Sequence, residues 1–207
     1  MKKFELTSEF NLNFFGRKFF RIKALVNIER YGVKAGDLGG WVEKEDNLSQ
    51  SGNAWVSGDA KVYGNAKVSG DAVVSGDAWV SGNAKVSGDA VVSGDAWVSG
   101  DAKVSGGAKV SGGAKVYGNA EVSGDAWVSG DADYAVIKGF GTVYRPTTFF
   151  RCHDGEARVT CGCFYGTIDE FREQVKRTRK GKVADEYLKI ADLMEYHFKE
   201  EDSGENV

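Results

Sequence analysis

Between Ala54 and Ala132 the chain repeats one six-residue unit, Ala-x-Val-Ser/Tyr-Gly-Asp/Asn/Gly, almost without interruption. Valine occupies the third place of every unit, at each sixth residue from Val56 to Val128. A period of six is too short for a helical repeat, but it suits a coil of three short strands per turn, with about 18 residues in each turn. Strands of neighbouring turns would then stack at roughly 4.8 Å. We therefore predict a mainly β protein with a parallel β-helix over residues 50–133, of about four and two-thirds turns.

Each place of the unit has a predicted role. Alanine and valine lie two residues apart in a short strand, so both point into the coil, and the residue between them points out. The Ser-Gly-Asp/Asn that follows forms the corner, because glycine, asparagine and aspartate tolerate positive φ. Gly107 and Gly113 stand where other units have aspartate or asparagine. This replacement predicts a left-handed backbone at the last place of the unit.

The outward residues fall on three faces when the sequence is folded at about 18 residues per turn. The first face carries Trp55, Val73, Val91, Lys109 and Trp127; the second carries Lys61, Trp79, Trp97, Lys115 and Asp133; the third carries Lys67, Lys85, Lys103 and Glu121. The first two faces are unusually apolar for solvated strands, and the third is a ladder of lysines. Exposed apolar patches mark contact surfaces, and tryptophan is enriched at interface hot spots.

The apolar outward residues therefore predict a binding surface. Its members are Trp55, Val73, Trp79, Val91, Trp97 and Trp127. Three kinds of cover remain open: the C-terminal helices of the same chain, further copies of the chain, or a foreign partner. A straight-sided coil offers the same patch on every copy, so we expect a homo-oligomer, either a dimer or a trimer.

Residues 1–49 differ in composition from the repeat and are predicted to cap it. An open coil end would expose apolar cross-section and unpaired backbone groups, so it must be covered. Residues 14–26 predict a hairpin with its turn near Gly16, and residues 36–43 lead into the repeat. The alternative function for this segment is a partner-binding domain.

Residues 134–207 predict a second hairpin followed by two helices. Asp154-Gly155 lies between alternating segments and indicates a two-residue turn. The resulting strand register pairs Cys152 with Ala157, Phe150 with Val159, and Thr148 with Cys161. The apolar face of the hairpin is then made of Phe150, Cys152, Ala157, Val159, Cys161 and Cys163.

The two helices are predicted from capping and periodicity. Thr167 and Glu170 form a capping box, which predicts a helix that continues to about Arg179. Apolar residues near helical spacing predict a second helix over residues 184–199. Residues 200–207 are polar, and we expect them to be frayed.

Composition limits the partners and the compartment. The net charge of −3 and the pI of about 5.5 argue against a general nucleic-acid binder. No stretch approaches the length of apolar sequence that spans a membrane, and the first residues begin no signal-peptide core. The three cysteines suggest no disulfide framework, so a reducing cytoplasm is the simplest expectation.

Catalytic and metal-binding patterns are weak. Cys152, His153, Cys161 and Cys163 would be the ligands of a Cys₃His zinc site. In the predicted hairpin all three cysteines face one way and His153 faces the other, so we favour a structural role for the cysteines. No catalytic residue, metal ligand or cofactor is assigned. The aspartate corners could collect calcium, but they alternate with asparagine and glycine, which favours solvated corners.

The repeat resembles the hexapeptide repeat of left-handed parallel β-helices, and the left-handed sense is implied by that resemblance. Acyltransferases and carbonic anhydrases of this type use histidines on the coil as bases or metal ligands. The repeat contains no histidine, because the only two in the chain are His153 and His197. We therefore expect a protein that is not an enzyme.

The whole chain resembles a family of phage- and prophage-encoded proteins that are mostly without assigned function. The resemblance rests on residues 20–25, on Gly-Asp-Leu-Gly-Gly-Trp-Val-Glu within residues 36–49, and on Cys-Gly-Cys-Phe-Tyr-Gly-Thr-Ile-Asp-Glu-Phe at residues 161–171. It implies an accessory protein in the cytoplasm of a bacterial host cell. We expect a non-enzymatic counter-defence inhibitor that binds a host defence protein or sequesters its signal molecule. The alternative is a hexapeptide-type transferase with an inter-subunit substrate site.

Overall fold

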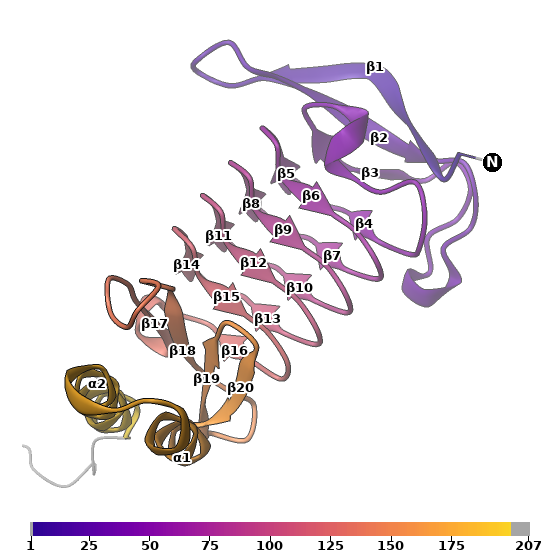
Figure 1. Cartoon of the computed structure of the whole chain (residues 1–207). Coiled ribbons are helices and arrows are strands. Elements are labelled where there is room, and N and C mark those ends of the chain that lie inside the picture. Colours follow the sequence, from indigo (N-terminus) through magenta and orange to yellow (C-terminus); the bar gives the residue numbers. More distant parts are fainter. Residues whose placement is uncertain (1, 200–207) are drawn as a thin grey trace, which may run out of the picture. The chain divides into compact units, whose positions relative to one another are not determined.

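The computed structural model describes residues 2–199 and divides the chain into two compact units, Met1–Asp131 and Ala132–Val207. Figure 1 shows the elements in chain order. The first unit contains a stack of short strands, here called the coil, preceded by an N-terminal segment. The second, here called the C-terminal unit, combines a small sheet with two helices. The residues predicted to fray, 200–207, lie outside the described part of the chain.

The coil is a parallel β-solenoid, as predicted. Its two-residue strands are β4 Trp55–Val56, β5 Lys61–Val62, β6 Lys67–Val68, β7 Val73–Val74, β8 Trp79–Val80, β9 Lys85–Val86, β10 Val91–Val92, β11 Trp97–Val98, β12 Lys103–Val104, β13 Lys109–Val110, β14 Lys115–Val116, β15 Glu121–Val122 and β16 Trp127–Val128. They form three parallel sheets with the orders β5-β8-β11-β14, β4-β7-β10-β13-β16 and β6-β9-β12-β15. The three predicted faces are confirmed for every assigned outward residue except Asp133, because each sheet carries the residues of one face. Asp133 was assigned to the second face but lies in the 3₁₀ turn Asp131–Asp133, beyond the last strand of the coil.

The interior of the coil is made of alanine and valine alone. Every repeat valine from Val56 to Val128 is fully buried, and every repeat alanine from Ala54 to Ala126 is at most 1% exposed. Backbone N–H groups donate to carbonyls one turn further on, as Trp79 N does to Ala96 O at 2.9 Å. Hydrogen bonds between turns thus satisfy the buried backbone while methyl groups fill the centre.

The corners correct one prediction about backbone conformation. The left-handed residue is the constant glycine of each unit, with φ between +58° and +73° from Gly52 to Gly124. Gly107 and Gly113, which were predicted to be left-handed, have no positive φ; Gly106 and Gly112 before them do. Stacking also demands glycine at the constant place, since a Cβ on Gly106 would lie 2.8 Å from the backbone nitrogen of Gly124. The last place needs no such freedom, which is why it accepts aspartate and asparagine.

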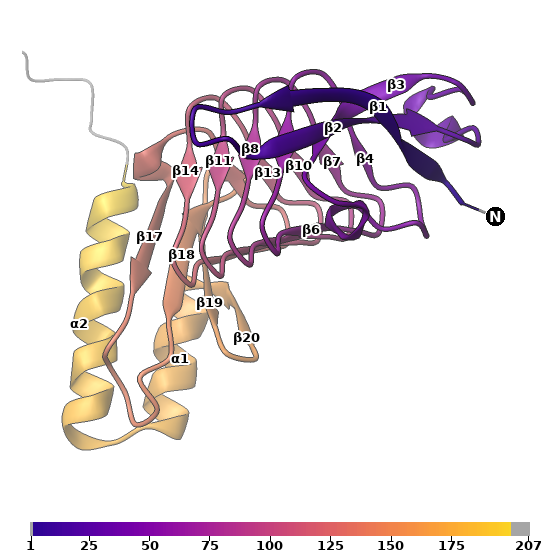
Figure 2. The same cartoon turned by 90° about the horizontal axis from the view of Figure 1, so that it is seen from above.

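The N-terminal segment extends one sheet of the coil. It contains β1 Phe4–Leu12, β2 Lys18–Ala24, the 3₁₀ turns Glu29–Tyr31 and Glu45–Asn47, and β3 Leu38–Val42. The predicted hairpin turn at Gly16 is confirmed, although its first strand begins earlier, at Phe4. β3 pairs in parallel with β5, so the sheet order is β1-β2-β3-β5-β8-β11-β14. Figure 2 shows β1 and β2 as one long antiparallel pair.

The N-terminal segment supplies the donors that the first turn of the coil lacks. Carbonyls of inner turns accept from the preceding turn, but the first turn has no turn before it. Its carbonyls instead accept hydrogen bonds from these groups: Lys3 Nζ to Gly52 O and Ala54 O, Trp41 N to Ala60 O, Glu43 N to Val62 O, Asn47 Nδ2 to Gly64 O and Ala66 O, and Ser49 N to Val68 O. The predicted cap therefore acts by satisfying the backbone as well as by covering the interior.

The C-terminal unit is an antiparallel sheet with two helices. Its strands are β17 Tyr134–Ile137, β18 Thr147–Arg151, β19 Ala157–Cys161 and β20 Phe164–Thr167, in that order across the sheet. The helices are α1 Ile168–Thr178 and α2 Gly181–Phe198. The capping box of Thr167 and Glu170 is confirmed, with both reciprocal hydrogen bonds present. The second helix begins at Gly181, three residues before the predicted start at Ala184.

The predicted register of the β18–β19 hairpin is wrong by one residue. Phe149 pairs with Val159, and Arg151 pairs with Ala157. The loop has three residues, because Cys152 N donates to Glu156 O and Gly155 takes the left-handed conformation with φ +83°. A slip of one residue moves side chains to the other face. Phe150 and Cys152 therefore lie on the face opposite to that of Val159 and Cys161, and the predicted six-residue apolar face does not form.

Candidate functional site

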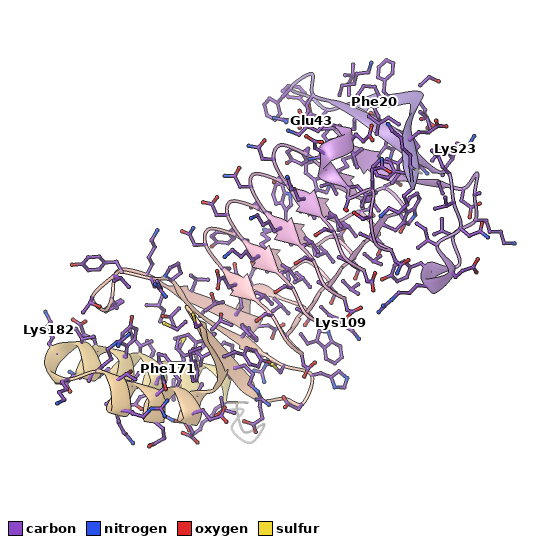
Figure 3. The ribbon with its side chains drawn as sticks, turned by 45° about the vertical axis from the view of Figure 1, so that its right-hand side comes forward. Phe20, Lys23, Glu43, Lys109, Phe171 and Lys182 are labelled. Carbon is purple, nitrogen blue, oxygen red and sulfur yellow. The ribbon has the colours of Figure 1, made fainter. Side chains whose placement is uncertain are left out.

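The structure separates the six predicted surface residues into two groups on two sheets. Trp79 and Trp97 are neighbours in the β5-β8-β11-β14 sheet, and the other four belong to the β4-β7-β10-β13-β16 sheet. Val73 and Val91 pair directly on adjacent turns and are half-buried. Lys109, labelled in Figure 3, stands between Val91 and Trp127 and breaks the apolar column. The predicted residues therefore lie on two sheets, in agreement with their assignment to the first and second faces.

Trp55 does not belong to an open surface. Its side chain is 3% exposed, although its place in the repeat points it outward. The backbone of Gly39 in β3 lies against the indole, so closely that a Cβ on Gly39 would be 2.7 Å from Trp55 Cζ2. The N-terminal segment of the same chain thus covers Trp55, and the expectation that it is available to a partner is wrong.

Trp79 and Trp97 end a column of edge-to-face rings, here called the aromatic ladder. Its members in order are Phe19, Tyr63, Trp79 and Trp97, with ring centroids 5.5, 6.1 and 5.5 Å apart. Each contact of this kind contributes about 0.5–1.5 kcal/mol beyond burial. The ladder links the N-terminal segment to the coil, and only its last member, Trp97, is strongly exposed, at 42%.

Cations flank the aromatic ladder. The Arg17 guanidinium lies 5.1 Å from the centroid of Tyr63 and also pairs with Glu43 at 2.7 Å. Lys61 Nζ lies 5.3 Å from the ring of Trp79. These contacts place positive charge against ring faces, where the ring quadrupole attracts it. The cations therefore lie against the inner members of the aromatic ladder, Tyr63 and Trp79.

The hairpin of β1 and β2 carries an exposed apolar tip that the sequence reasoning missed. Phe14 and Phe15 are 98% and 89% exposed, and their rings meet edge to face at 5.5 Å. Phe10 and Leu12 on β1 are also exposed. The sequence does contain a signal for this exposed tip, because two phenylalanines directly precede the glycine of the hairpin turn and turn tips are ordinarily polar. Phe14 and Phe15 are the most exposed large apolar side chains among the described residues of the first unit, and Trp127 and Trp97 are exposed to 44% and 42%.

The cysteine and histidine residues do not gather. Cys152 is buried, Cys161 is half-buried on the opposite face of the sheet, and Cys163 is exposed in the two-residue turn before β20. The prediction that all three cysteines share one face is wrong, for the register reason given above. Within residues 2–199, no three or more His, Cys, Asp or Glu side chains are placed to hold a metal ion.

Comparison with known proteins identifies the repeat. The YdcK β-solenoid repeat matches at residues 60–76, 66–82, 84–100 and 114–130, all within the coil. The matches therefore support membership of a repeat β-helix class for this part of the chain. A comparison with curated proteins finds no match. Among the described residues, neither helix is long and apolar enough to cross a membrane.

Proposed function

We propose that this chain is a non-enzymatic binding protein whose contacts are made by exposed aromatic residues of the first unit. The observation that carries the proposal is the exposure of Phe14, Phe15 and Trp97, three large apolar side chains at positions that a monomer ordinarily fills with polar residues. The coil contains no histidine, and this distinguishes the proposal from the alternative of a hexapeptide-type transferase.

The first partner is a further copy of the chain. Trp79 and Trp97 lie on a straight-sided sheet, which can meet the same sheet of another copy in a closed dimer or trimer. Val73 and Val91 widen the apolar surface on the next sheet. Tryptophan residues at the centre of such contacts contribute most of the binding energy.

The second partner is a molecule of the bacterial host. The resemblance to phage-encoded proteins supports an accessory role in the host cytoplasm, as a counter-defence inhibitor that binds a defence protein or sequesters its signal molecule. The hairpin tip supports the choice of a protein partner, because paired phenylalanines on a projecting turn suit insertion into an apolar groove.

Light scattering tests the assembly. Trp79→Lys combined with Trp97→Lys should shift the mass toward that of a monomer while the coil stays folded, since both side chains point outward. The matched control is Lys67→Ser with Lys85→Ser, which changes two outward residues of the lysine ladder. A wild type that is monomeric at tens of micromolar, or a tryptophan variant of unchanged mass, would contradict the assembly.

Affinity capture from bacterial lysate tests the host partner. Wild-type chain should retain a partner that the Phe14→Ser, Phe15→Ser variant loses, and small molecules extracted from the bound material would reveal a sequestered signal. Equal retention by wild type and variant would remove the hairpin tip from the proposed contact.

A further inference from the structure

The C-terminal unit contains a pocket of about 340 Å³ that no part of the proposed function uses. This volume lies at the lower end of the range for small-molecule sites. Its apolar wall comes from Phe164, Phe171 and Tyr187, and its polar rim includes Arg145, Gln174 and Arg179. Figure 3 labels Phe171 on α1. Within residues 2–199, no aspartate or glutamate lines the pocket, so this part of its lining carries a net positive charge.

The aromatic wall is rigid. Phe171 lies between its two neighbours, with ring centroids 5.5 Å from Phe164 and 5.8 Å from Tyr187. Phe171 and Tyr187 are almost fully buried, whereas Phe164 is half-buried. The Tyr187 hydroxyl donates to the Phe140 carbonyl at 3.4 Å. Burial raises the pKa of Tyr187, so its hydroxyl stays protonated at neutral pH. The half-buried ring of Phe164 therefore offers most of the apolar surface that a ligand ring can contact, and Phe171 packs behind it.

Among the described residues, the two arginines of the rim have no acidic partner. Most other arginines of the described chain lie within 4.0 Å of a carboxylate, as the pairs of Arg17, Arg30 and Arg172 show. Arg145 and Arg179 have no such pair within residues 2–199. A guanidinium fork without a carboxylate is suited to bind a phosphate through two parallel hydrogen bonds.

The backbone on both sides of Arg145 is restricted. Tyr144, the residue before it, has φ +52° and is the only described non-glycine residue with positive φ. Pro146 follows and restricts Arg145 to extended conformations. The Arg145 side chain passes over Gly162, where a Cβ would meet its Nη1 at 2.5 Å.

We propose that this pocket binds a small molecule that joins an aromatic ring to a phosphate, such as a nucleoside monophosphate. The ring would lie against Phe164 and Phe171, and the phosphate would be held by Arg145 and Arg179. The pocket lies wholly within the C-terminal unit, so the proposal stands independently of the contacts proposed for the first unit.

Isothermal titration calorimetry of the full chain with AMP, phenyl phosphate, adenosine and inorganic phosphate tests the pocket. AMP or phenyl phosphate should bind at least about tenfold more tightly than adenosine or inorganic phosphate alone, because only the joined molecule uses both the wall and the rim. Tight AMP binding with weak phenyl phosphate binding would identify a nucleotide as the preferred source of the ring. The proposal is overturned if inorganic phosphate binds as tightly as AMP. It is also overturned if none of the four compounds has a dissociation constant below about 1 mM.

Variants locate the binding. Arg145→Gln and Arg179→Gln should each raise the dissociation constant about fivefold or more, as expected for loss of a charge-assisted hydrogen bond. Arg177→Gln is the matched control, since Arg177 lies in the last turn of α1, two residues before Arg179, has no carboxylate partner within residues 2–199 and does not itself line the pocket, although it contacts Gln174. It should change the constant by less than about twofold. An equal loss in all three variants would mean that general charge attracts the ligand, and the pocket would be rejected.

Discussion

The coil and the C-terminal unit bury their side chains in different ways. In the coil, the inward residue of every strand is a valine and every unit has a glycine at its corner, so the residues vary most at the outward place. In the C-terminal unit, eleven buried residues of different sizes, from Ala184 to Phe149, pack between a sheet and two helices. Uniform packing yields flat faces, whereas packing of unequal side chains leaves hollows. The coil is thus suited to extended contacts and the C-terminal unit to a small ligand.

Substitution of a buried valine of the coil should cause the largest loss of stability. Val92→Asp would bury a charge with no partner and should lower the free energy of unfolding by more than about 4 kcal/mol, enough to unfold the coil. Lys85→Ala, on an outward place, should change it by less than about 0.5 kcal/mol. Thermal unfolding followed by circular dichroism measures both. Similar midpoints for the two variants would refute the assignment of inward and outward places.

Glycine substitutions compare the two regions directly. Gly106→Ala should cost about 2–3 kcal/mol, since φ is positive and a Cβ would meet the next turn. Gly155→Ala in the β18–β19 loop has positive φ but open space around it, and should cost only about 1 kcal/mol. Gly107→Ala should be nearly neutral. Denaturant unfolding of the three variants measures the loss of unfolding free energy at each position. A larger loss for Gly107→Ala than for Gly106→Ala would contradict the assignment of the left-handed conformation to Gly106.

Local capping in the C-terminal unit predicts a smaller effect. Thr167→Ala removes the hydrogen bond that Glu170 N donates to Thr167 Oγ1 at 3.1 Å, and should cost about 1 kcal/mol. Glu173→Ala, an exposed change on the same helix, is the control and should cost a few tenths at most. If Thr167→Ala were as silent as its control in urea unfolding, the helix would owe its stability to packing alone.

Lys3 predicts a modest dependence of stability on pH. Burial lowers its pKa from 10.5 to about 8, partly offset by the negative charge of Asp71. Between these two values the unfolded chain binds more protons than the folded chain, so the free energy of unfolding should rise with pH across this window. Below about pH 8 the cost of the buried charge is fully present, and above about 10.5 it is gone.

Comparison with Lys3→Met isolates this contribution. Other groups titrate identically in both proteins, so the difference in unfolding free energy between wild type and variant should change with pH between about 8 and 10.5 and be flat below. Urea unfolding at several pH values measures it. If the difference in unfolding free energy between wild type and Lys3→Met does not change with pH, the ammonium of Lys3 is solvated in the folded protein.

Regular features of this molecule could be predicted from the sequence, whereas features made by distant residues could not. The valine period fixes the three sheets and places Trp79 beside Trp97. It cannot reveal that β3 covers Trp55, because that contact joins the repeat to a segment of different pattern. The loop at Gly155 was misjudged because Asp-Gly fits both a two-residue and a three-residue turn. The pocket escaped notice because its arginines, Arg145 and Arg179, are far apart in sequence and share no motif.

The spacing of the turns also constrains how such a chain can change in length. Residues that stack on one sheet are eighteen apart, as Trp79 and Trp97 are. Insertion or deletion of eighteen residues would leave every outward column on its own sheet. A gain or loss of six would preserve the interior equally well, yet it would move every later outward residue to the next sheet and give it different neighbours in its column. A duplication of any whole number of six-residue units therefore preserves the folded interior. The arrangement of outward residues is conserved only when the number of duplicated units is a multiple of three.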